Sequence, residues 1–368
     1  MSIGERLRYA RERIGLTLSK VAEKVDIGVS SLSEFENGKR EPSMRQLQAL
    51  SKLYRRPISF FFSEGEIASE IVLWRQQPEK STRQELEDTF VTLCEQYHNL
   101  ESWCGDIFPC RLPAIRSEHE GFGYPDAENL AYEVRKTLQL GDYPAPALLR
   151  ILEEVCGIKV FHLAFDPSGC AACTVSGTFG MAILLNKKNV RWRRNFDLAH
   201  ELFHLLTWKI FRKTIPSDLT LPGEKEEQLA NIFASNLLMP EEVLKNAFDF
   251  LVRNNTIAFS SLSDIARQFD VSIEALIWRL TSLRRLDRKH AEEVIDRYKT
   301  PYTIYEKRKD EEPPERPERY VALALKALRT GEISIGRFAE YLGISRREAS
   351  SYIEQEFNEN EEIAVVAP

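Results

Sequence analysis

Two histidines and a glutamate stand at a spacing that suits a hydrolytic metal site. His200, Glu201 and His204 form an H-E-x-x-H motif inside the largely apolar stretch 196–206. On a helix, side chains four residues apart share one face at about 5–6 Å, so both imidazoles can reach one zinc ion at about 2.0–2.1 Å. Glu201 would then lie beside the metal, where it can act as general base towards a water molecule.

A catalytic zinc site needs a third protein ligand, with the fourth position left to water. The best candidate is Glu227, which lies 23 residues beyond His204 on a separate expected helix. Apolar residues such as Phe233 would pack that helix against the motif helix. We therefore expect His200, His204 and Glu227 to bind Zn²⁺, with Mn²⁺ as the alternative, because imidazole and carboxylate suit several metals.

The chemistry that this set predicts is hydrolysis of a peptide bond, with Glu201 as the catalytic residue. The alternative is a buried helix on which His200 and His204 have only structural partners. The apolar surroundings argue against the alternative, because a buried imidazole pair without partners is costly.

The size of the chain predicts several domains and its composition predicts a cytoplasmic protein. A length of 368 residues favours two or three domains. The N-terminal residues carry no apolar signal segment, and the longest apolar runs are far too short to span a membrane. Six cysteines in such a chain are expected to be free thiols. The C-x-x-C pair Cys170 and Cys173 favours a loop and strand over a metal or redox site.

Charge is distributed unevenly along the chain. Residues 1–60 hold 12 Lys and Arg against 7 Asp and Glu, a formal charge of +5, which leaves −11 for the remainder of a chain whose net charge is −6. A basic head on an acidic body predicts a nucleic-acid contact that is confined to the head.

The hydrophobic periodicity predicts a mainly α protein with a small α+β domain and an N-terminal five-helix bundle. Within the bundle, short helices at 18–25 and 29–36 are joined by a three-residue turn, the arrangement of a helix-turn-helix. Strands are expected at 158–163 and within 174–185, and helices at 191–208 and 225–238. The expected units are a head (1–64), a helical connector (65–120), the mixed domain (121–300), a linker (301–319) and a C-terminal helical segment (320–368).

The mixed domain resembles the ImmA/IrrE-type metallopeptidases over about residues 125–285. The matching stretches are 158–161, 177, 184–186, 193–204 and 227–240. The resemblance implies a zincin-like fold with Glu227 as a metal ligand. It also implies regulated cleavage of proteins, often DNA-binding repressors, in bacterial stress, prophage or mobile-element control.

The head resembles the Xre/Cro-type helix-turn-helix, most clearly over residues 33–43. By that resemblance Val29–Glu36 is the recognition helix in the major groove of double-stranded operator DNA. The implied contacts with bases, backbone or phosphates come from Val29, Ser30, Ser31, Glu34, Lys39 and Arg40.

The head also departs from that family pattern. A glutamine often opens each of the two central helices in the family, but Leu18 and Val29 stand there in this chain. Glu34 replaces a residue that is commonly basic, and a carboxylate is unfavourable near phosphate unless it binds a cytosine amine. The alternative for the head is a bundle used for dimerisation or for docking a partner.

Together these patterns predict a homodimeric bacterial regulator that binds DNA and cleaves a regulatory protein, such as an Xre-type repressor, or itself. The alternative is a non-enzymatic, ligand-sensing repressor or an antitoxin-like docking protein built on the same fold.

Overall fold

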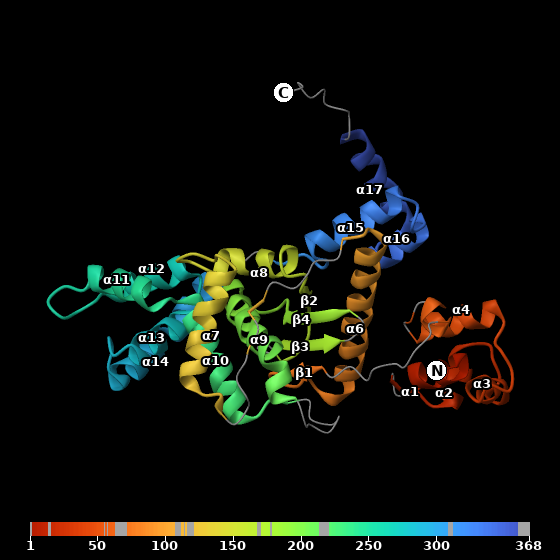
Figure 1. Cartoon of the computed structure of the whole chain (residues 1–368), viewed down its shortest axis with the longest axis horizontal. Helices are drawn as coiled ribbons and strands as arrows, with labels where there is room; N and C mark the ends of the chain where they lie inside the picture. The colour runs from red at the N-terminus through yellow and green to blue at the C-terminus, as the bar shows by residue number, and fades with distance from the viewer. Residues whose placement is uncertain are drawn as a thin grey trace.

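The structure is a computed structural model, and it confirms a mainly helical chain with one small sheet (Figure 1). It describes residues 2–13, 16–54, 56, 58–62, 72–106, 112–113, 115, 121–167, 171–176, 179–212, 221–307 and 312–359. Cys170 of the C-x-x-C pair and residue 177 of the family resemblance lie outside these residues. Within them, no helix has both the length and the apolar character needed to cross a bilayer.

The head is the expected five-helix bundle. Thr17 caps the second helix by accepting a hydrogen bond from the Lys20 amide, and Ser43 and Gln46 form a capping box at the fourth. Its core is built from apolar residues on all five helices. The helices are α1 (Ile3–Arg13), α2 (Leu18–Lys24), α3 (Val29–Glu36), α4 (Met44–Leu53) and α5 (Ile58–Phe62).

A buried carboxylate and a glycine hold α3 against α1. The Glu36 carboxylate accepts two hydrogen bonds from the Arg11 guanidinium, at 2.6 and 2.8 Å, a paired geometry that is both strong and directional. Gly4 permits the close approach of the two helices, because a Cβ atom there would lie 2.4 Å from the Phe35 carbonyl oxygen.

A mixed four-stranded sheet forms the centre of the body, with strand order β1-β3-β4-β2. β2 and β4 are parallel, whereas β3 is antiparallel to both of its neighbours. The strands are β1 (Leu73–Trp74), β2 (Lys159–Leu163), β3 (Ala171–Ser176) and β4 (Gly180–Asn186). The two-residue β1 comes from the segment that the sequence analysis treated as a connector.

Alternation along the strands gives the sheet two apolar faces and the body two cores. Ile183 and Leu185 face α8 (Ala145–Glu154) and α9 (Arg191–Phe211) in the first core. Leu184 and Phe161 lie on the opposite face, in the second core. That core is covered by α6 (Lys80–Trp103) and by the C-terminal helices α15 (Glu318–Arg329), α16 (Ile335–Leu342) and α17 (Arg346–Glu359).

Buried ion pairs fix the second core. Glu101 on α6 lies 2.8 Å from Lys159 Nζ on β2 and accepts a hydrogen bond of 2.5 Å from Arg319 on α15. Each of these charges is largely removed from water, so loss of any one would leave its partners uncompensated. The expected connector helix and the expected tail are therefore structural parts of the body.

The remaining helices lie at the far end of the body from α6 and the head (Figure 1). α14 continues to residue 307, so helix occupies part of the segment that the sequence predicted as linker. These helices are α7 (Tyr124–Thr137), α10 (Glu224–Leu238), α11 (Glu241–Leu251), α12 (Phe259–Phe269), α13 (Ile273–Ser282) and α14 (Arg288–Lys307).

The α1–α3 contact can be tested with Gly4→Ala. The added methyl group would clash with the backbone of α3, and overpacking of this kind costs about 1–3 kcal/mol. We expect amide hydrogen exchange in α1 and α3 of the full chain to accelerate by about one to two orders of magnitude. Gly28→Ala is the control, because its Cβ would meet only the Ser30 hydroxyl at 4.0 Å. Unchanged protection in Gly4→Ala would show that the two helices need not approach so closely.

Candidate metal centre

The histidine motif lies on α9, in the interior of the body. One face of this helix packs on β3 and β4 and another packs on α10. Leu202 and Phe203 are fully buried in the first core, which fixes the rotation of the helix about its axis. As a result His200, Glu201 and His204 are all at most 1% exposed.

Three ligand atoms from α9 and α10 converge on one point. His200 Nε2 and His204 Nε2 lie 3.2 Å apart, and Oε1 of Glu227 lies 3.4 Å from the first and 3.3 Å from the second. Tetrahedral zinc with bonds of about 2.0–2.1 Å separates its ligand atoms by about 3.3–3.4 Å. The triangle therefore has the size that one such ion requires, and its residues are those the sequence analysis brought together.

Both imidazoles are oriented through their other ring nitrogen. His200 Nδ1 lies 3.1 Å from Asn231 Oδ1, and His204 Nδ1 lies 2.9 Å from Glu226 Oε1. Since an amide or carboxylate oxygen can only accept, each Nδ1 carries the proton. Each Nε2 can then present its lone pair towards the centre of the triangle, as in metal-binding histidines generally.

The electrostatics of the centre favour a cation. Burial disfavours a charged His204, but the carboxylates of Glu226 and Glu227 outweigh it and raise its pKa to about 9. Burial also opposes ionisation of Glu227, yet hydrogen bonds with the two histidines lower its pKa well below the usual range. Burial lowers the pKa of His200 to about 3, which keeps that ring neutral. His200 and Glu227 are therefore in the forms that bind divalent metals, whereas an arriving ion would displace a proton from His204.

Glu201 is a buried carboxylate with no hydrogen-bond partner for either oxygen among the described residues. Burial raises its pKa to about 7. The charge of His204 and the adjacent Cys173 thiol oppose this shift, because both favour the ionised carboxylate. A general base works best when its pKa lies near the working pH. Because Glu201 lies beside the three ligand atoms, its carboxylate can exchange a proton with a water molecule bound there.

Several residues that complete the centre were missed by the sequence analysis. Arg75, directly after β1, donates a hydrogen bond of 2.6 Å to the fully buried Asp197 and one of 3.4 Å to Asn231. Arg212 donates to both oxygens of Glu226. Only Asn231 carried a signal, since it lies one turn beyond Glu227 on the same helix face. Arg75 is 122 residues from Asp197, and no local pattern connects the two.

The structure places most of the predicted DNA-contact residues on the surface of the head. Val29, Ser30 and Glu34 are exposed on α3, whereas Ser31 is half-buried between them. Lys39 and Arg40, just after α3, are exposed, and the Arg40 guanidinium lies 5.9 Å from the Phe35 ring centre. The buried face of α3 carries Leu32, Phe35 and Glu36.

Two family models match separate parts of the chain. The Helix-turn-helix model matches residues 7–61, and the IrrE N-terminal-like domain of peptidase family M78 matches residues 153–281. The chain therefore joins a helix-turn-helix domain to a domain of a metallopeptidase family, as the sequence analysis expected. β1, Arg75 and α6 lie outside both matches.

Curated relatives are transcriptional regulators by name. The chain is 37% identical over 68 residues to the HTH-type transcriptional regulator ImmR of Bacillus subtilis (strain 168), covering 18% of this chain and 54% of the relative. It is 41% identical over 54 residues to the HTH-type transcriptional regulator DdrOP3 of Deinococcus deserti, covering 15% of this chain and 42% of the relative. The chain thus spans about half the length of the curated relatives it matches.

The role of Asn231 in orienting His200 can be tested by Asn231→Ala. Loss of a partner to the second nitrogen of a metal-binding histidine typically costs about 10–100-fold in metal affinity. We expect that loss for Zn²⁺ in a chelator competition assay. Gln228→Ala is the matched control, because Gln228 is exposed on the same helix and, among the described residues, hydrogen-bonds with Tyr124 and Glu224 and with neither histidine. Equal zinc affinity in wild type and Asn231→Ala would contradict the role.

Proposed function

We propose that this chain is a bacterial DNA-binding transcriptional regulator that hydrolyses a peptide bond in a regulatory protein or in itself. The observation that carries the proposal is the triangle of His200, His204 and Glu227 with the unpartnered Glu201 beside it. The match to a metallopeptidase family over residues 153–281 supports the same chemistry.

Zinc is the metal that the ligand set favours. Two imidazoles and one carboxylate with tetrahedral spacing are a common catalytic zinc set, although Mn²⁺ accepts the same ligands. The hydrogen bonds from each Nδ1 hold the imidazoles in one tautomer, so the centre is organised before an ion arrives.

In the proposed mechanism the residues of the chain position the ion and move one proton. Zinc, when bound, supplies a Lewis acid that polarises the scissile carbonyl and acidifies water. Glu201 accepts the proton from the attacking water and later passes it to the leaving amine. Burial suits Glu201 to both steps, because a carboxyl group whose pKa is near 7 can accept and return a proton at neutral pH.

The proposed DNA interface is the exposed face of α3 with the turn that follows it. Val29, Ser30 and Glu34 would face the major groove, with Ser31 contributing from its half-buried position. Lys39 and Arg40 would approach phosphates. A homodimer is proposed as well, because a single helix-turn-helix contacts only one half-site.

Glu201→Gln separates catalysis from metal binding. Glutamine keeps the shape of the side chain but cannot accept the proton, and loss of a general base typically costs about 10²–10⁴-fold in rate. We expect the variant to retain zinc by elemental analysis. Cleavage of itself, or of a helix-turn-helix repressor encoded beside its gene, should fall by that factor. A fully active variant would support the non-enzymatic alternative for this fold.

Lys39→Ala tests the head as a DNA-binding domain. Each lost phosphate contact should reduce the slope of log affinity against log salt concentration by about 0.9. Fluorescence anisotropy with DNA from upstream of the gene measures that slope. The control is Lys289→Ala, which removes the same charge from an exposed position on α14. Equal slopes for both variants, or no binding by the wild type, would favour a head that docks to protein.

A further inference from the structure

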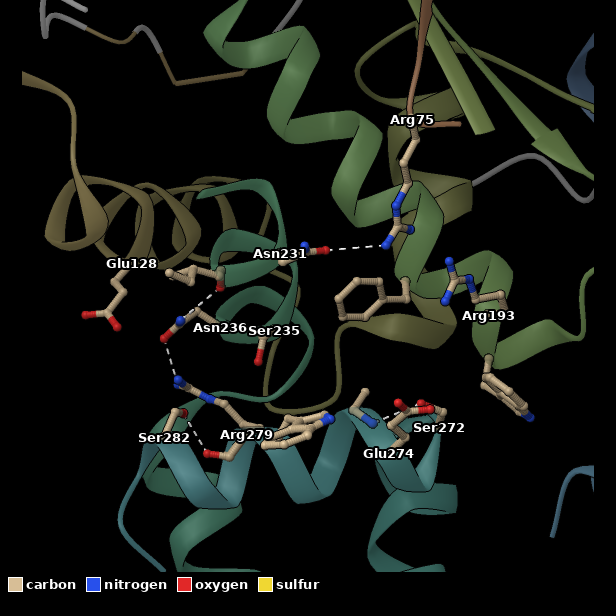
Figure 2. A pocket seen from close by; sticks show the side chains of 15 residues that line it. Arg75, Glu128, Arg193, Asn231, Ser235, Asn236, Ser272, Glu274, Arg279 and Ser282 are labelled. Carbon is tan, nitrogen blue, oxygen red and sulfur yellow. Dashed lines mark hydrogen bonds between the residues drawn. The ribbon is translucent and has the colours of Figure 1, made fainter. Parts of the chain in front are cut away.

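A cavity of about 550 Å³ lies between α9, α10 and α13, next to the metal centre (Figure 2). Its lining includes Arg75 and Asn231, the two residues whose hydrogen bond borders the centre. Figure 2 shows this pair at one side of the cavity, with Ser235 and Asn236 following on α10 and Arg279 facing them from α13. A volume of this size suits several residues of a peptide or one small ligand.

One row of side chains leads from the metal ligands into the cavity. Glu227, Asn231 and Ser235 are spaced four residues apart on α10 and therefore share one face. None of the three is buried, so the row stays open along its length. Ser235 lies about 12 Å beyond Glu227 along the helix axis, because eight residues rise about 1.5 Å each.

The lining of the cavity combines ten polar or charged residues with five apolar ones. Trp278 is 39% exposed on α13, a helix whose other face buries Ile277 and Leu280 in the first core. The other apolar lining residues are Trp192 and Phe196 of α9, Ile232 of α10 and Ala275 of α13. Partly exposed aromatic and aliphatic side chains gathered in one concave lining, among polar groups, are typical of ligand sites.

The charged groups at the lining balance one another in number. Arg75 and Arg193 both pair with Asp197. The Arg279 guanidinium donates a 2.6 Å hydrogen bond to Asn236. Glu128, which is exposed, and Glu274 add negative charge to the same lining. Three arginines are thus matched by three carboxylates, Asp197, Glu128 and Glu274, so the charges at the described lining sum to zero. A neutral occupant fits this balance, and Trp278, Phe196 and Ile232 offer it apolar contacts.

We propose that this cavity is the specificity subsite of the peptidase and that it receives a large apolar side chain of the substrate. An extended peptide advances about 3.3–3.6 Å per residue. If its scissile bond lies at the metal centre, the residue two to four positions away therefore lies over Asn231 and Ser235. The side chain of that residue packs between Trp278 and Phe196. The identity of the occupant as a substrate side chain rests on the proposed peptidase function. Binding of a peptide to the cavity can nevertheless be measured without catalysis.

The binding test uses the full chain with Glu201→Gln, loaded with zinc, and three acetylated tripeptide amides whose central residue is Phe, Asp or Lys. The five tryptophans give five indole signals in a ¹⁵N spectrum, and Trp278→Phe assigns the relevant one. We expect the Phe peptide to shift the Trp278 signal saturably, at least about 10-fold more tightly than the other two. No shift, or equal affinity for the Asp peptide, would overturn the proposal.

The cleavage test compares the sites cut in a defined peptide library by wild type, Trp278→Ala and Ala275→Phe. The first variant removes a wall and the second fills the cavity from α13. Wild type should prefer a large apolar residue two to four positions from the cut bond by about 10-fold, and both variants should lose that preference. Phe250→Ala is the control, since Phe250 is 73% exposed and outside the cavity lining. Unaltered preference in both variants would refute the subsite.

The two tests separate the two proposals. Binding of the Phe peptide at Trp278 without cleavage of any library member would leave the subsite standing and refute the peptidase. Cleavage with a preference that does not change in Trp278→Ala or Ala275→Phe would support the peptidase and refute the subsite.

Discussion

The structure depends on one geometric constraint: three ligand atoms from two helices must meet within 3.4 Å of one another. Two of them come from α9, where the helix repeat alone aligns them. The third comes from α10, so its position depends on how the two helices pack. Phe203 and Phe233 make that contact with ring centres 5.6 Å apart. The hydrogen bonds of Asn231 and Glu226 then connect α10 to the imidazoles of α9. The same two helices, α9 and α10, therefore set both the distance between the ligand atoms and the orientation of the imidazole rings.

Much of this could be predicted from the sequence, because the relevant signals are local. The spacing of His200 and His204 places them on one helix face, and the adjacent Glu201 follows from the same motif. The two central helices of the head were recognisable from the three-residue turn that joins them. The strands β2 and β4 were visible as short apolar runs. Glu227 was found because it begins a second apolar helix at a plausible distance along the chain.

What the sequence did not reveal depends on contacts between distant segments. A two-residue strand such as β1 has no periodicity to detect, yet it brings Arg75 to Asp197 and Asn231. Glu226 and Glu227 are adjacent glutamates that no local pattern distinguishes. Only the packing of α10 directs Glu226 to His204 Nδ1 and Glu227 to the centre of the triangle. The cavity at Trp278 was equally invisible, because its walls come from three helices. A charged, Pro-rich run indicated a linker before the C-terminal helices, but no local pattern showed that α15 is fixed to α6 and β2 through Glu101.

The two-faced sheet has a consequence for how such a protein can evolve. The stretch that matches the metallopeptidase family, residues 153–281, provides only one side of its own sheet with cover. The opposite side, with Phe161 and Leu184, is covered by α6 from before the match and α15 from after it. Recombination that moved only the matched stretch into another gene would leave that side bare and the sheet without its edge strand. The unit that can fold with a covered sheet is therefore longer than the stretch that matches the family, and it runs from β1 to the C-terminal helices.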